Sequence, residues 1–174
     1  MDPAHLSPES CSNASTSLVL RTSTCTPEAA AAALQLDPGL ERLDLTTREV
    51  DATCLVSPGT LAKNEGATAE DLHVALISGQ VNASLRVCAD VTGNILTPCS
   101  QPHRVEFVGD WLDTKAGFSD RCVEMASSYT GRDMDAPGDL KVVVLRRQAG
   151  AQPQEACSVM SDSSRMSSVF HIGG

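Results

Sequence analysis

Aromatic residues are scarce in this sequence, which has one Trp, one Tyr and three Phe among 174 residues. Its core must therefore be built from smaller aliphatic side chains, which bury less area per residue. Basic residues are also few, because 13 Lys and Arg stand against 22 Asp and Glu, for a formal net charge of −9. An acidic chain with no basic cluster is a poor partner for nucleic acid or an anionic membrane surface. The only basic doublet, Arg146-Arg147, follows an apolar run and is interpreted as the solvent end of a strand.

Long apolar runs are missing too, so no stretch of the sequence is expected to span a bilayer. The first residues, Met1-Asp2-Pro3, have neither the basic n-region nor the apolar h-region of a signal peptide. Seven cysteines are nevertheless typical of an exported, disulfide-bonded protein. We therefore expect an extracytoplasmic chain that is a soluble piece of a longer protein. Any membrane contact would be through an anchor outside this sequence.

Aligning the chain with itself reveals six landmarks that recur in the same order. They are a Cys-Ser pair, a cysteine that opens a helix, a Pro-Gly pair, an apolar strand, a strand with a cysteine, and a final apolar strand ending in Gly. In the first half the landmarks are Cys11-Ser12, Cys25, Pro38-Gly39, 40–45, Cys54 and 72–79, and in the second they are Cys99-Ser100, Cys122, Pro137-Gly138, 140–145, Cys157 and 168–173.

This repetition predicts an α+β fold of two tandem modules, 1–79 and 80–174, each a mostly antiparallel sheet with one packed helix. The first module would be incomplete at its N-terminus. Its helix should start at Thr26, a good N-cap that precedes a proline. The second helix should start at Ser119 and end at Gly131, with an apolar stripe at i, i+3, i+4 and i+7.

The matched landmarks also predict how the cysteines pair. We expect disulfides Cys25–Cys54, Cys88–Cys99 and Cys122–Cys157. A two-residue turn at Gly93-Asn94 would place residues 88 and 99 opposite each other in a hairpin. Cys11 aligns with Cys99 and would find its partner before residue 1, so it should be unpaired in this chain. A rival pairing joins Cys11 to Cys25 or Cys54 and leaves another thiol free.

A more specific pattern runs from Cys99 to Glu106, where the sequence reads Cys-Ser-x-Pro-His-x-x-Glu and includes Pro102 and His103. This stretch resembles the actinobacterial septum-formation family, and the resemblance covers residues 85–174 directly. It implies the extracytoplasmic domain of a membrane-anchored cell-envelope protein with a link to cell division. The first half has no Pro-His and no Glu after Cys11-Ser12, so the role of this motif is not duplicated.

His103 and Glu106 could form a metal-binding or an acid–base pair. Zinc requires three or four ligands, however, and no other His or Cys has the required spacing. We therefore expect a structural role for His103, with no catalytic residue, no metal and no cofactor.

Three function classes remain open. The first is an interaction or scaffold module that binds envelope or membrane proteins. The second is a module for a cell-wall polymer, although only Trp111 and Tyr129 could stack on a sugar. The third and least favoured is a metalloprotein or hydrolase that depends on His103.

Overall fold

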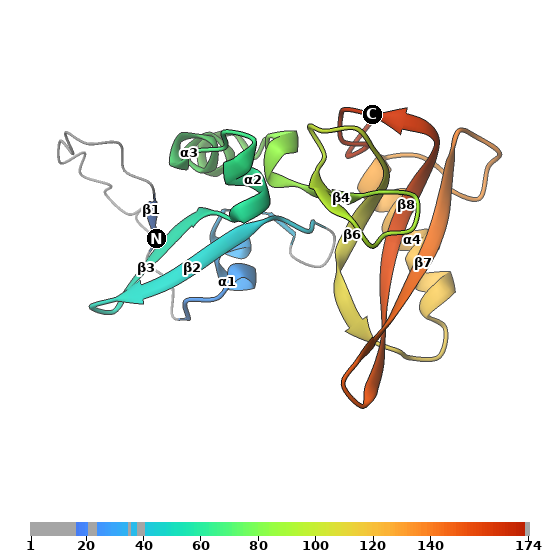
Figure 1. The fold of residues 1–174 in the computed structure, drawn as a ribbon, viewed down its shortest axis with the longest axis horizontal. Helices are drawn as coiled ribbons and strands as arrows, with labels where there is room; N and C mark the ends of the chain where they lie inside the picture. Colours follow the sequence, from blue (N-terminus) through green and yellow to red (C-terminus); the bar gives the residue numbers. More distant parts are fainter. Residues whose placement is uncertain (1–16, 21–23, 35, 38–40, 173–174) are drawn as a thin grey trace, which may run out of the picture.

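The computed structural model describes residues 17–20, 24–34, 36–37 and 41–172 (Figure 1). It has the α+β architecture that the sequence predicts, with two antiparallel sheets of strand order β1-β3-β2 and β5-β4-β6-β8-β7. Its elements are β1 (Leu18–Leu20), α1 (Pro27–Ala33), β2 (Leu45–Val50), β3 (Thr53–Pro58), α2 (Thr60–Asn64), α3 (Ala69–Ser78), the 3₁₀ helix η1 (Ala83–Leu85), β4 (Val87–Ala89), β5 (Leu96–Pro98), β6 (His103–Asp113), α4 (Phe118–Thr130), β7 (Leu140–Ala149) and β8 (Gln152–Arg165).

The two sheets share one arrangement of elements. In the first half β1, α1, β2 and β3 follow one another, and β3 lies between β1 and β2. In the second half β6, α4, β7 and β8 follow in the same way, and β8 lies between β6 and β7. Disulfides join Cys25, just before α1, to β3 and Cys122 of α4 to β8. This correspondence agrees with the predicted tandem arrangement, while the module boundaries at 79 and 80 stay a prediction.

The two closing strands predicted from the sequence are wrong. Residues 72–77 belong to helix α3, which begins with a capping box between Thr68 and Asp71 and ends at Gly79 with φ +67°. Those terminal signals favour a helix over the strand that the apolar run suggests. Residues 168–172 form no strand, and buried Val169 packs in the core beside α4.

Three local predictions near the motif and the helices also need correction. Helix α4 begins at Phe118 after Gly117, which adopts φ +74°, so Ser119 is not its N-cap. The strand expected over 40–45 reduces to single bridges at Glu41 and Leu43, and β2 starts only at Leu45; residue 40 lies outside the described residues. The β4–β5 hairpin pairs Cys88 with Thr97, because Asp90 closes a longer turn by accepting hydrogen bonds from the backbone of residues 94 and 95.

Residues 41–44 connect the two sheets. Glu41 forms a bridge with Val108 of β6, and Leu43 forms one with Arg86, immediately before β4. Leu85 packs in the hydrophobic core of the first half, although it follows residue 80 in the sequence. The two halves therefore share backbone pairing and core contacts, which fixes the side chains that lie between them.

The second sheet has two different faces. One face packs against α4 through a cluster that includes Val108, Tyr129 and Val159. The other face carries a smaller cluster around Phe107, with Trp111 and Leu145 partly buried beside it. No helix of the described residues packs on this second face as α4 does on the first, and the β4–β5 connection lies over part of it (Figure 1).

Candidate functional site

The Cys-Ser-x-Pro-His-x-x-Glu motif lies where β5 leads into β6. The Cys88–Cys99 disulfide anchors its start to β4, with 5.0 Å between the Cα atoms. Pro102 is exposed, whereas His103 and Glu106 on β6 are 3% and 1% exposed. The two motif side chains capable of acid–base chemistry thus point into the protein.

Glu106 accepts hydrogen bonds from three donors. These are the Tyr129 hydroxyl on α4, the Ser168 hydroxyl and the Val169 backbone N–H, the last at 2.7 Å. A buried carboxylate is costly unless it is well hydrogen-bonded, and these donors meet that need. Glu106 therefore ties β6 to α4 and to the C-terminal segment.

Arg86 lies next to this carboxylate and joins it to the first half of the protein. Its guanidinium is 2.7 Å from the Glu41 carboxylate and 3.3 Å from the Tyr129 hydroxyl oxygen, which accepts a hydrogen bond from it. It also stacks 4.0 Å from the ring centre of Phe170. The side chain is only 2% exposed, so its charge is balanced by Glu41 and Glu106 rather than by water. We name the set Glu41, Arg86, Glu106, Tyr129 and Ser168 the buried polar network.

Tyr129 is the centre of this network. Burial raises the pKa of its hydroxyl well above the ordinary value near 10, and the adjacent negative charge of Glu106 raises it further, while Arg86 acts in the opposite direction. The hydroxyl therefore stays protonated over the physiological range and can donate to Glu106. Its chemistry is that of a fixed donor rather than a base.

His103 is held by its neighbour in the chain. Its Nδ1 donates to the Gln101 carbonyl oxygen at 2.8 Å, which leaves Nε2 as the free ring nitrogen. Nε2 is buried without a hydrogen-bond partner in the described part of the chain. A side chain held in this way stabilises the bend that carries the backbone from β5 into β6, and it is buried away from solvent.

The ligand atoms of Cys88, Cys99, His103 and Glu106 lie within 4.8 Å of one another, a spacing that a metal site could use. Both sulfurs are joined in a disulfide, however, and a metal binds cysteine as the thiolate. The Glu106 oxygens already accept three hydrogen bonds. In this oxidised state the cluster offers too few free ligands for zinc.

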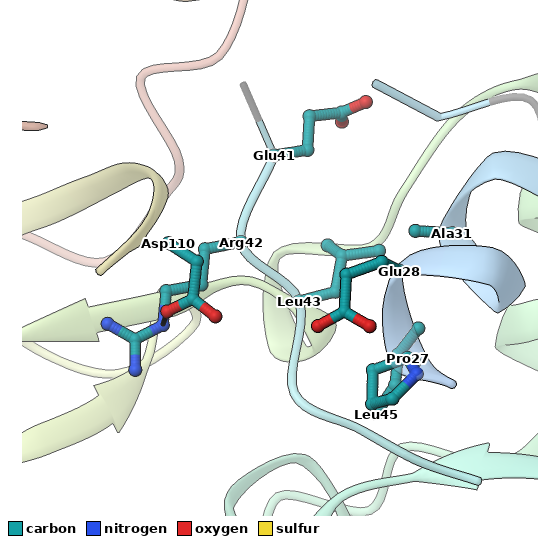
Figure 2. Close-up of a pocket in the computed structure, with 8 residues that line it drawn as sticks. All are labelled: Pro27, Glu28, Ala31, Glu41, Arg42, Leu43, Leu45 and Asp110. Atoms are coloured by element: carbon teal, nitrogen blue, oxygen red, sulfur yellow. Dashed lines mark ion pairs between the residues drawn. The ribbon is translucent and has the colours of Figure 1, made fainter. Parts of the chain in front are cut away.

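A small pocket lies beside residues 41–44, between α1 and β6. Figure 2 shows Arg42 turned toward Asp110, with Glu28 of α1 opposite and the Glu41 carboxylate directed elsewhere. Its volume of about 50 Å³ is far below that of a ligand site. Arg42 pairs with Asp110 at 3.5 Å here, while the same side chain also lines a larger cleft.

The structure contains all three disulfides that the sequence predicts, Cys25–Cys54, Cys88–Cys99 and Cys122–Cys157. Cys11 lies outside the described residues. Sequence reasoning identified Glu106 but missed its hydrogen-bond donors Tyr129 and Ser168, and it missed the buried pair of Arg86 with Glu41. One signal was available for Arg86, because an arginine inside the apolar run from Leu85 to Ala89 needs a buried partner.

Comparison with known proteins gives no match to a protein-family model, a curated protein or a solved structure. Within the described ranges, no helix combines the length and the apolar character needed to cross a bilayer.

Proposed function

We propose that this chain is the extracytoplasmic domain of a membrane-anchored cell-envelope protein, and that it acts as an interaction or scaffold module with a link to septum formation. The observation that supports this most is the internal use of the motif residues. Glu106 belongs to the buried polar network and His103 is bound to the backbone beside a disulfide. Motif residues used in this way stabilise the fold, so binding to a partner would use exposed residues of the surface.

The compartment is supported by the covalent structure. Three disulfides in 174 residues indicate folding in an oxidising environment outside the cytoplasm. The link to septum formation depends on the resemblance over residues 85–174, and its specific part is the motif from Cys99 to Glu106. The membrane anchor belongs to the same proposal.

A test is to export the chain, fused to a membrane anchor, into the envelope of an actinobacterium with a photo-crosslinking amino acid at exposed positions. Cross-links to defined envelope or division proteins support the proposal. Cross-links to wall polymer alone would favour the wall-ligand alternative instead. Stoichiometric zinc in protein purified without chelator, lost in His103→Ala, would favour the metalloprotein alternative.

A further inference from the structure

We propose that a cleft on the exposed face of the second sheet binds an extended acidic peptide segment of a partner protein. The cleft has a volume of about 320 Å³, within the range of ligand sites. This inference rests on the proposed interaction function and names the site and the chemistry of the partner. The residues that line the cleft are Arg42, Thr92, Gly93, Asn94, Leu96, Trp111, Val144, Leu145, Arg146 and Arg147.

The cleft is built by a loop that lies over the sheet. The β4–β5 connection reaches toward β7, so closely that a methyl group on Gly93 would come within 2.6 Å of the Leu145 side chain (Figure 1). The loop forms one wall, and residues 144–147 at the edge of the sheet form the other. Trp111 of β6 lies between these walls as part of the lining.

The lining of the cleft is rich in arginine, although Arg42 is paired with Asp110 at 3.5 Å. Three of the ten lining residues are arginines and none is acidic, although the whole chain carries a formal charge of −9. The Arg147 guanidinium donates hydrogen bonds to the neutral Gln154 amide oxygen, at 2.8 Å and 3.0 Å, and forms no ion pair among the described residues. Arg146 pairs with Glu155 at 2.9 Å, and because it follows Leu145 on β7 its side chain points to the α4 face of the sheet, away from Trp111. Arg147 is therefore the cation of the lining that remains available to carboxylates from outside.

Two of the arginines, Arg42 and Arg147, lie over aromatic rings. Arg147 lies 4.3 Å from the ring centre of Trp111, and Arg42 lies 4.4 Å from that of Phe107. The two rings are 5.9 Å apart and tilted by 57°, so the four side chains form one contiguous cluster. Burial lowers the pKa of Arg42, and the like charge of Arg147 lowers it further, although Asp110 acts in the opposite direction. A bound anion would relieve this repulsion between neighbouring cations.

A peptide suits the cleft better than an anionic glycan. Sugar binding needs an open aromatic face, and Arg147 covers a face of Trp111. The loop beside the cleft instead exposes apolar side chains, with Ile95 at 69% and Val91 at 51%. An acidic segment that also carries apolar side chains would match both the arginines and this apolar rim.

Trp111 is the only tryptophan, so its fluorescence reports on the cleft alone. Iodide and caesium quenching, each normalised to N-acetyltryptophanamide, measure the local charge. We expect iodide to quench more strongly than caesium in the wild type, and Arg146→Gln/Arg147→Gln to reverse the order. The control Arg132→Gln/Lys141→Gln removes the same charge from two exposed residues away from the cleft lining and should change nothing. Stronger quenching by caesium in the wild type would overturn the proposal.

Binding is then measured by anisotropy with a labelled ten-residue peptide that alternates Leu with Asp or Glu. The Arg146→Gln/Arg147→Gln variant should bind about tenfold more weakly than wild type, as expected for loss of charge-assisted contacts. The control double variant should bind like wild type, and a peptide with Asn and Gln in place of the acids should not bind. Binding of polygalacturonate instead of the peptide would overturn the proposal, as would self-association through the cleft in sedimentation.

Failure here is distinguishable from failure of the proposed function. If envelope proteins cross-link equally well to wild type and to Arg146→Gln/Arg147→Gln, the cleft assignment is wrong and the interaction function stands. If the cleft binds the acidic peptide but no envelope protein cross-links to the exported chain, the proposed function is wrong and the site stands.

Discussion

Replacing Arg86 by Met tests the buried polar network, because Met keeps an unbranched apolar stem and removes the guanidinium with its charge and its hydrogen bonds. The change leaves the Glu41 carboxylate, whose side chain is 6% exposed, without its cation at 2.7 Å. Removing one partner of a buried ion pair costs about 3–5 kcal/mol of the free energy of unfolding. At a urea m-value of about 2 kcal/mol/M, this lowers the unfolding midpoint by roughly 2 M.

The double variant Arg86→Met/Glu41→Gln separates two costs in the free energy of unfolding. One is the loss of the ion pair, and the other is the burial of a carboxylate without its cation. It should regain at least about 1 kcal/mol relative to Arg86→Met, since no carboxylate at residue 41 remains uncompensated. The matched control Arg132→Met breaks an exposed pair with Asp139 and should cost less than about 1 kcal/mol. Urea unfolding without reductant, followed by Trp111 fluorescence, measures all three. A loss below about 1 kcal/mol for Arg86→Met, or no recovery in the double variant, would refute the reasoning.

Three further predictions concern single features of the fold. Tyr129 is the only tyrosine, and its pKa is raised in the folded protein, so its contribution to stability is complete below the unfolded pKa near 10 and decreases as pH rises above it. Absorbance at 295 nm should therefore show phenolate forming above the usual range in folded protein and near pH 10 in urea. Equal titration midpoints in the two states would show that Tyr129 is not buried. His103→Ala should lower the free energy of unfolding by about 1–3 kcal/mol without loss of peptide binding, and unchanged stability would contradict a structural role. Cys122→Ser/Cys157→Ser should cost roughly 2–5 kcal/mol in a thermal melt, and an unchanged melting temperature would argue against that disulfide.

Local signals account for the parts of the fold that the sequence predicts well. Thr26 accepts a hydrogen bond from the Ala29 N–H and Pro27 follows at the first helical position, so the start of α1 is visible within four residues. The stripe that includes Cys122, Ala126 and Tyr129 likewise marks the buried face of α4. The disulfides could be predicted because the cysteines recur in step with these elements.

The prediction of a strand over 72–77 failed for a different reason. Its apolar run fits a short strand as well as a helix, and only the capping signals at Thr68 and Gly79 distinguish the two. These signals were present in the sequence and carry more information than the run itself. The hairpin register failed because a side chain, Asp90, sets the length of the turn.

The buried polar network and the cleft could not be predicted from local patterns. Arg86 meets Glu41 and Tyr129 across 45 and 43 residues of sequence, and such distant contacts leave no periodic signal in a single chain. The doublet Arg146-Arg147 does end near solvent, as the sequence suggests, but its position opposite the β4–β5 loop depends on how the sheet folds. The buried polar network and the proposed binding cleft therefore depend on contacts that only the tertiary structure reveals.

The most direct test of the central claim, a disulfide-stabilised module from an oxidising compartment, is mass-spectrometric mapping of the unreduced protein exported to the periplasm. Cleavage before Asp90 separates Cys88 from Cys99, and tryptic cleavage separates the other two pairs. The structure predicts Cys25–Cys54, Cys88–Cys99 and Cys122–Cys157, each within one half of the chain. A bond between the halves, or these six cysteines recovered as free thiols, would contradict it.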